Sequence, residues 1–181
     1  MSLHDRIEFA MITFVHDKMY GLFMKPHKLL IPAGLKNGQH VLEVGCGPGF
    51  FTLPAAEIVG KEGLIYANDI NPFAIKKVEK KIEKASVKNV KTLLEDVTET
   101  SLDDNSIDLA FLFGFIHSLK KLLDKVLIEM HRILKDDGSI SLQKWMISEE
   151  KLIKDITKDG LFKLNEKTKR ILVFKKISQT K

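Results

Sequence analysis

Short apolar runs alternate along the chain with longer segments in which apolar residues recur every three or four positions. The first pattern is typical of buried strands and the second of amphipathic helices. Strands are predicted at 41–44, 64–68, 90–94 and 107–113, in the segment after Gly138, and at 162–166 and 170–176. Helices are predicted at 7–23, 27–31, 52–59, 72–85, 120–134 and 149–158. This alternation predicts an α/β fold in three layers, with helices on both faces of a mainly parallel sheet.

The first predicted strand runs directly into a glycine-rich loop, Gly45-Cys46-Gly47-Pro48-Gly49-Phe50. Glycine has no Cβ and tolerates positive φ, so a ligand can rest on main-chain N–H groups of such a loop. The third glycine comes one position earlier than in the Gly-x-Gly-x-x-Gly pattern of dinucleotide-binding proteins. The spacing therefore argues against a bound pyrophosphate, and a strand-to-helix turn without a ligand is the alternative.

Two acidic residues follow the next two predicted strands. Asp69 lies about 20 residues beyond the loop, where one carboxylate can accept hydrogen bonds from both hydroxyls of a ribose. Asp96 follows the third strand. The alternatives are that Asp69 or Asn71 caps the helix beginning at Pro72, and that Asp96 is a solvated charge at a loop end. Because parallel strands end at one edge of the sheet, a ligand site is predicted at that edge.

Glu43, two residues before the first glycine, completes a stretch that resembles motif I of the class I S-adenosylmethionine-dependent methyltransferases, in particular their type 11-like small-molecule group. The sequence Arg132-Ile133-Leu134-Lys135, followed by Gly138, resembles a second stretch of that family. The resemblance spans residues 36–176. It implies a Rossmann-like methyltransferase fold with a mainly parallel, seven-stranded sheet whose last strand is antiparallel.

The resemblance also implies roles for single residues. The loop would cradle the methionine part of S-adenosylmethionine, Asp69 would bind the ribose, and Asp96 would accept from the adenine amino group. His117 matches a histidine of many small-molecule members and is a candidate for catalysis, although a lone histidine is more often structural. The residues that the resemblance places at the cofactor are Glu43, Gly45, Cys46, Gly47, Gly49, Phe50, Asp69, Ile70, Asp96, Val97, Phe113 and Gly114.

A length of 181 residues fits one domain. Residues 36–181 would form the cofactor-binding core, and the resemblance implies a helical lid segment at 1–35. No apolar run approaches the roughly 20 residues that span a bilayer, and the N-terminus lacks a signal-peptide pattern, so we expect a cytoplasmic protein. Cys46 is the only cysteine, which excludes an internal disulfide and a cysteine-based structural zinc site. The sequence does not indicate an oligomeric state.

The net charge of +5 raises the question of nucleic acid binding. Much of the excess comes from lysines in the predicted helix at 72–85 and just after it, interleaved with Glu79 and Glu83. At helical spacing such a set is more often a solvated face than a phosphate-binding patch. An RNA or protein substrate therefore stays an alternative.

Methyl transfer from a sulfonium is an in-line displacement with a neutral thioether as leaving group. The protein has to align the reactants and exclude water. No Asn/Asp-Pro-Pro-aromatic sequence follows the fourth strand, which argues against the enzymes that methylate adenine or cytosine amino groups. Phe113 and Gly114 stand where metal-dependent catechol-type relatives carry a carboxylate, so no catalytic metal is expected. We expect a small-molecule acceptor; a nicotinamide-dependent oxidoreductase and a binding-only protein are the other classes left open.

Overall fold

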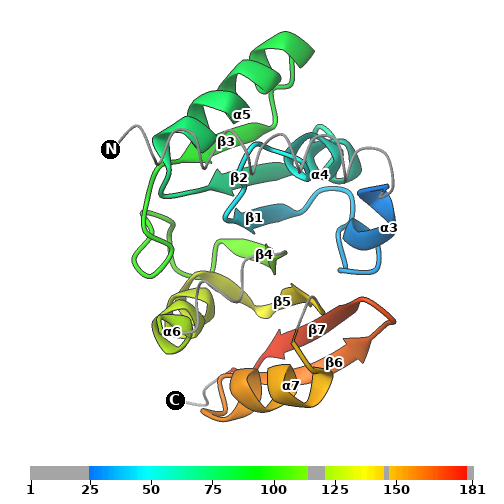
Figure 1. Ribbon diagram of the computed structural model, residues 1–181, viewed down its shortest axis with the longest axis vertical. Coiled ribbons are helices and arrows are strands. Elements are labelled where there is room, and N and C mark those ends of the chain that lie inside the picture. The colour runs from blue at the N-terminus through cyan, green and yellow to red at the C-terminus, as the bar shows by residue number, and fades with distance from the viewer. Residues whose placement is uncertain (1–24, 114–120, 145–146, 179–181) are drawn as a thin grey trace.

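The computed structural model describes residues 25–113, 121–144 and 147–178. Seven strands form one sheet in the order β3-β2-β1-β4-β5-β7-β6 (Figure 1). The strands are β1 (His40–Val44), β2 (Leu64–Asn68), β3 (Val90–Leu93), β4 (Ile107–Leu112), β5 (Leu134–Gln143), β6 (Phe162–Lys167) and β7 (Ile171–Lys176). The helices are α3 (His27–Leu30), α4 (Thr52–Val59), α5 (Pro72–Ala85), α6 (Leu123–Ile133) and α7 (Glu149–Thr157). The predicted helix at 7–23, and with it most of the predicted lid segment, lies outside the described residues.

The strand pairing confirms a mainly parallel sheet whose last strand is antiparallel. Strands β1 to β5 pair in parallel, whereas β7 lies antiparallel between β5 and β6. The chain builds outward from β1 to β2 and β3, then returns to place β4 on the other side of β1. This reversal lies between β1 and β4, and open α/β sheets bind their ligands beside such a point.

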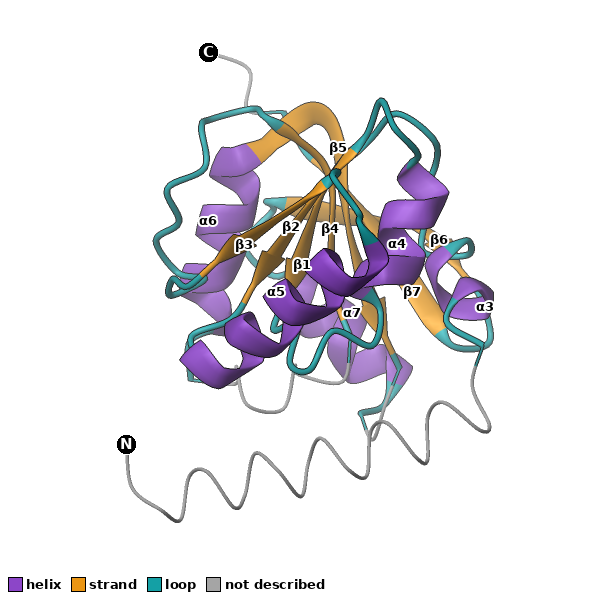
Figure 2. Cartoon of the chain, turned by 90° about the horizontal axis from the view of Figure 1, so that it is seen from above, coloured by secondary structure: helices purple, strands orange, loops and turns teal. Residues whose placement is uncertain are grey.

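Helices cover both faces of the sheet (Figure 2), and the alternation of strand side chains decides which helix covers which face. Val41 and Leu109 pack with α3 and α4, whereas Leu42 and Ala110 pack with α6 and α7. Helix α5 packs through Val78 against β2 and the loop after β1. The three layers predicted from the sequence are therefore present.

Helix α5 starts where the sequence places it. The Asn71 side chain accepts a hydrogen bond from the Phe73 N–H at 2.9 Å, and Pro72 occupies the first turn. An asparagine cap followed by proline is a favoured helix start because it satisfies one N–H and removes another. Asn71 is therefore the cap that the sequence offered as an alternative role, and Asp69 is available for other contacts.

One expectation about β5 is wrong. The sequence predicted a turn around Gly138 before the fifth strand, but β5 runs through it from Leu134. Ile107 pairs with Leu134 while Leu109 pairs with Ser139, so β5 carries extra residues there as a bulge. Only a residue without a Cβ fits at Gly138, since a Cβ would lie 2.8 Å from the Lys135 carbonyl oxygen.

Candidate functional site

The loop after β1 contains glycines that are needed for two different reasons. Gly45, Gly47 and Gly49 have φ of 67°, 51° and 78°, which side-chain-bearing residues rarely adopt. A Cβ on Gly49 would lie 2.9 Å from Val78 Cγ2, so this glycine lets α5 approach the loop. A Cβ on Gly47 would meet no heavy atom of the described residues within 4 Å. As far as the described part of the chain goes, Gly47 leaves room for a ligand directly on the backbone.

The loop does not offer the N–H groups that the sequence interpretation assigned to it. The Cys46 N–H donates to the Asn68 carbonyl oxygen at 2.8 Å, and the Gly49 N–H donates to the Cys46 carbonyl oxygen at 2.9 Å. The Gly47 N–H donates to Asp69 Oδ2 at 2.9 Å. The chain itself uses these three donors to fix the loop, so the expectation of N–H groups presented to a ligand is wrong for them. At Gly47 the loop offers a ligand a polar backbone surface that no side chain of the glycine covers.

Glu43 lies below the loop as a buried carboxyl group. It is 2% exposed, and its Oε2 accepts a hydrogen bond from Thr52 Oγ1 at 2.6 Å. Burial raises the pKa of Glu43 to about 8; the Thr52 hydrogen bond acts in the opposite direction, and nearby Asp69 raises the pKa further. Glu43 is therefore mainly protonated at neutral pH, and it ties the end of β1 to the first residue of α4.

Cys46 is no nucleophile. Burial raises the pKa of its thiol far above the ordinary value, and the nearby carboxyl groups of Glu43 and Asp69 add to the rise. Thiolate is the reactive form of cysteine, and this environment disfavours it. Cys46 belongs to the site through its place in the loop and its buried side chain.

Asp69 directly follows β2 and is fixed by main-chain donors from two elements. Its Oδ2 accepts the Gly47 N–H at 2.9 Å, and its Oδ1 accepts the Asn71 N–H at 2.8 Å. Each carboxylate oxygen has a further lone pair, so this geometry leaves one acceptor position on each oxygen. The next side chain, Ile70, is 65% exposed. An oriented carboxylate beside an uncovered apolar surface is suited to a sugar attached to a flat ring.

Asp96 lies in the loop between β3 and β4. Its Oδ1 accepts from both the N–H and the Oγ1 of Thr98, at 2.9 and 2.8 Å. These bonds hold the pKa of Asp96 below its ordinary value, with a smaller contribution from the Lys125 charge. Oδ2 accepts no hydrogen bond from any residue that the structure describes.

Val97 follows with its side chain in the core, 4% exposed. Within the same described ranges, its N–H donates to no acceptor. A carboxylate oxygen and an adjacent N–H thus stand open together, which is the donor and acceptor pair that the edge of an adenine ring needs.

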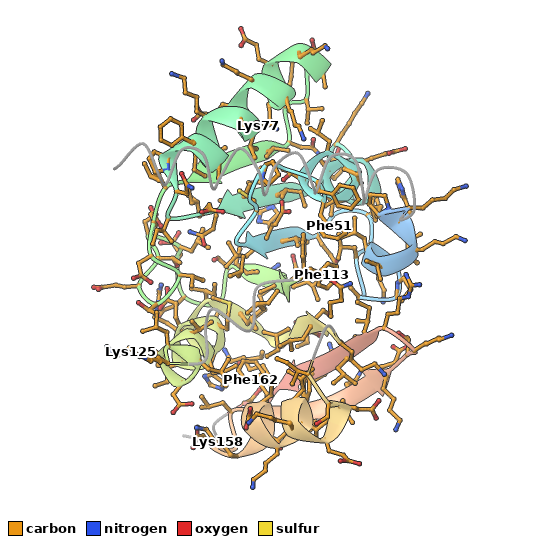
Figure 3. The ribbon with its side chains drawn as sticks, viewed as in Figure 1. Phe51, Lys77, Phe113, Lys125, Lys158 and Phe162 are labelled. Carbon is orange, nitrogen blue, oxygen red and sulfur yellow. The ribbon has the colours of Figure 1, made fainter. Side chains whose placement is uncertain are left out.

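Phenylalanine rings form the wall between the glycine loop and the end of β4. The Phe51 and Phe113 rings meet edge to face with centroids 5.2 Å apart. Figure 3 labels both side chains. The ring centroids of Phe111 and Phe113 are 5.0 Å apart, and those of Phe50 and Phe51 are 4.8 Å apart. Phe113 is 8% exposed. The predicted contacts of Gly114 and His117 lie outside the described residues.

Sequence reasoning missed two polar residues that shape the site. The sequence predicts Thr52 only as the start of a helix, whereas its hydroxyl donates to the buried Glu43 carboxyl group. Asn68 ends the strand predicted at 64–68; it is 1% exposed, and its Nδ2 donates to the Glu95 carbonyl oxygen at 2.8 Å. The signal for Asn68 was available, because a polar residue inside an otherwise apolar strand needs a partner.

Other surface features lie apart from this edge. A hollow of about 870 Å³ lies between α4 and the residues after α5, lined by Leu53, Pro54, Glu57, Ser86 and Lys88 among others. Asp69 and Asp96 do not line it. Among the described residues, no three histidine, cysteine, aspartate or glutamate side chains gather as metal ligands would. None of the described helices combines the length and the apolar character needed to cross a bilayer.

A family model described as "Methyltransferase domain" matches residues 35–176. The chain belongs to this family. The match covers all of the strands and every helix of the described structure except α3. The membership confirms the family-level prediction made from motif I and the Arg132–Lys135 stretch, and it favours methyl transfer over the nicotinamide alternative.

Two relatives with sequence similarity bear on this methyltransferase domain. The demethylmenaquinone methyltransferase of Geobacillus stearothermophilus is 34% identical over 106 residues, 58% of this chain and 44% of the relative. The ubiquinone/menaquinone biosynthesis C-methyltransferase UbiE of Pseudoalteromonas translucida is 29% identical over 123 residues, 67% of this chain and 48% of the relative. The chain thus spans about half the length of the curated relatives it matches.

A solved structure matches over nearly the whole chain. A SAM dependent methyltransferase from Aquifex aeolicus superposes with a TM-score of 0.80 at 26% identity, covering 94% of this chain and 98% of that one. The likeness confirms the Rossmann-like methyltransferase fold of the sequence analysis.

Proposed function

We propose that this methyltransferase domain binds S-adenosylmethionine at the carboxyl edge of its sheet and transfers the methyl group to a small-molecule acceptor by in-line displacement. The observation that carries the proposal is the pairing of two oriented carboxylates, Asp69 and Asp96, with a bare glycine backbone at Gly47. Family membership and the likeness to the Aquifex aeolicus structure support it. The early third glycine weighs against a dinucleotide in the same place.

The residues fit the parts of this cofactor. Asp69 would bind the ribose hydroxyls, Ile70 would cover one face of the adenine, and Asp96 Oδ2 with the Val97 N–H would bind its edge. The open space at Gly47 would take the methionine part. When bound, the cofactor supplies an activated methyl group on a positively charged sulfur.

The chain's contribution to the reaction would be alignment and exclusion of water rather than proton transfer. Phe51 and Phe113 form an apolar wall between the loop and β4. Such a wall strengthens the attraction between the cationic sulfur and the fixed acids, because it lowers the local dielectric constant. No described side chain has to act as acid or base for this step. Whether His117 does so remains a prediction.

For the acceptor, we infer a flat, apolar small molecule. The phenylalanine wall supports this choice, as do the two relatives, which are named for demethylmenaquinone and for ubiquinone/menaquinone biosynthesis. An RNA or protein acceptor is the alternative. Lys76, Lys80 and Lys84 lie exposed on α5, but Glu79 and Glu83 alternate with them, so the helix offers no unbroken positive face.

Turnover with a methyl-labelled donor tests the proposal. The protein and labelled S-adenosylmethionine are incubated in separate reactions with one acceptor each: a reduced naphthoquinone lacking the methyl group, a catechol, or bulk RNA. We expect label in an organic-extractable product with an apolar acceptor, and none with RNA. Label in RNA would support the alternative acceptor. Failure of the protein to bind the donor at all would contradict the proposal at its base.

A further inference from the structure

The loop that carries Asp96 is held by a partly buried ion pair on α6, the helix that packs on the same side of the sheet as Val97 and Leu102. Glu129 is 6% exposed, and its Oε1 accepts from the Thr100 N–H at 2.8 Å and from Thr100 Oγ1 at 2.7 Å. Burial raises the pKa of Glu129, but the hydrogen bonds from Arg132 and Thr100 outweigh burial and leave that pKa below its ordinary value. Glu129 is therefore an ionised group, and it binds the loop through the backbone and side chain of Thr100.

Arg132, one turn further along α6, completes the attachment. Its Nε and Nη2 donate to the two oxygens of Glu129 at 2.9 and 2.6 Å. The same guanidinium donates to the carbonyl oxygens of Thr100 and Leu102, at 3.1 and 2.8 Å, and to Asp104 Oδ1 at 2.6 Å. A planar fork with five N–H donors can satisfy all these acceptors at once, which a lysine cannot do.

The attachment point lies close to Asp96 along the chain, and the intervening residues have few ways to move. The Glu95 carboxylate accepts from the Ser101 N–H and Oγ at 2.9 and 2.6 Å. Val97 and Leu102 are both anchored in the core that α6 covers. A change in the position of Thr100 is therefore passed to Asp96 through the three residues between them, a short segment held by Thr98, Val97 and the contacts of Thr100 itself.

We propose that Glu129 and Arg132 are positioning residues for the adenine end of the site, acting through Thr100 to set the place of Asp96. The inference rests on the proposed function, because it takes the ligand of Asp96 to be an adenine. The Arg132–Lys135 stretch, which resembles a second stretch of the family, thereby gains a role in cofactor recognition through Arg132. Glu129 and Arg132 would act through the loop, without contacting the cofactor themselves. A merely structural role would weaken the binding of every ligand alike, whereas positioning affects recognition of the adenine amino group.

The test measures this recognition with two ligands, by calorimetry on the full chain. One is S-adenosylhomocysteine; the other is its N6,N6-dimethyl analogue, which has no amino hydrogen for Asp96. We expect the wild type to prefer the first by about tenfold, the size of one hydrogen bond to a charged group. Thr100→Val removes one donor to Glu129 with little change in volume, and it should reduce the preference to about twofold. Thr100→Ser keeps the hydroxyl, so this variant should show the same preference as the wild type.

Arg132→Lys provides a second variant that keeps the charge and loses the fork. We expect it to lose the preference in the same way, at a temperature where circular dichroism shows it to be folded. The control is Asp104→Asn, which removes an exposed partner of the same guanidinium; exposed pairs contribute little, so the preference should stay within about twofold of the wild type.

Each outcome decides something. If Thr100→Val and Arg132→Lys weaken both ligands equally and keep the wild-type preference, the network is structural only and the inference is wrong. If the wild type binds both ligands without preference, Asp96 does not read the amino group and the inference also fails, while the proposed function stands. If the wild type binds neither ligand, the proposed function fails and the inference with it.

Discussion

Asp69 and Asp96 follow paired strands at the same edge of the sheet, yet the chain holds them by different means. Asp69 is fixed by two main-chain N–H groups. One belongs to Gly47 in the loop after β1, and the other to Asn71 in the short loop between β2 and α5. Asp96 is fixed by Thr98 in its own loop, and that loop is fixed in turn by Glu129 and Arg132 from α6.

This difference predicts how each end of the site responds to change. The Asp69 end depends on two backbone donors, so its geometry follows from the local fold and survives most side-chain substitutions nearby. The Asp96 end depends on side chains about 30 residues further along the chain, so distant substitutions can alter it. Recognition of the ribose should therefore be the more robust of the two.

The largest effect is expected from Asp69→Ala. Two hydrogen bonds to one carboxylate are lost, so affinity for S-adenosylhomocysteine should fall by about 100-fold or more. Calorimetry measures it. Asp108→Asn is the matched control, because Asp108 also accepts a main-chain N–H, from His40 at 2.7 Å, but lies at the opposite edge of the sheet. Its affinity should match the wild type; equal losses in both variants would contradict the assignment.

The second effect concerns pH and the buried Glu43 below the Asp69 end. The folded chain keeps a proton on Glu43 up to about pH 8, whereas the unfolded chain releases it near the ordinary pKa of 4.5. Between about pH 5 and pH 8 this group therefore lowers the free energy of unfolding as pH rises, by up to about 1.4 kcal/mol per pH unit.

Glu43→Gln isolates that contribution. The amide keeps an oxygen for Thr52 Oγ1 and carries no titrating proton, so stability of the variant should fall less steeply with pH than that of the wild type. Urea unfolding at several pH values across the window measures the two slopes. Identical slopes would show that Glu43 titrates normally in the folded chain.

A smaller effect is expected at the other end of the site. Asp96→Ala removes one hydrogen bond to the adenine amino group, so affinity should fall by about tenfold, clearly less than for Asp69→Ala. The N6,N6-dimethyl analogue should bind this variant and the wild type almost equally. A loss in Asp96→Ala that matches or exceeds the loss in Asp69→Ala would reverse the comparison between the two ends.

The sequence was sufficient to predict most of the fold, and it pointed to the glycine loop and Asp69 as parts of a candidate site. Periodicity placed the described helices and strands to within a few residues. The glycine spacing and Asp69 after β2 predicted two parts of a candidate site, and the Gly47 N–H does donate to Asp69. These features are local, because each lies in one strand and the turn that follows it. The bulge in β5 was missed because the Lys135–Gly138 segment reads as a turn, and only its pairing with β4 makes it strand.

The support of the site could not be predicted in the same way. Glu129 and Thr100 are 29 positions apart, and sequence spacing says nothing about which loop faces which helix. The use of the loop N–H groups by Asn68 and Asp69 was also out of reach, because a glycine-rich loop shows that backbone is exposed but not what it binds.

A crystal structure of the chain with S-adenosylhomocysteine tests the central claim most directly. The account predicts that the ribose hydroxyls lie within hydrogen-bond distance of Asp69, with the adenine amino group on Asp96 Oδ2 and the homocysteine over Gly47. The ligand in another place, such as the hollow between α4 and the residues after α5, would contradict the account.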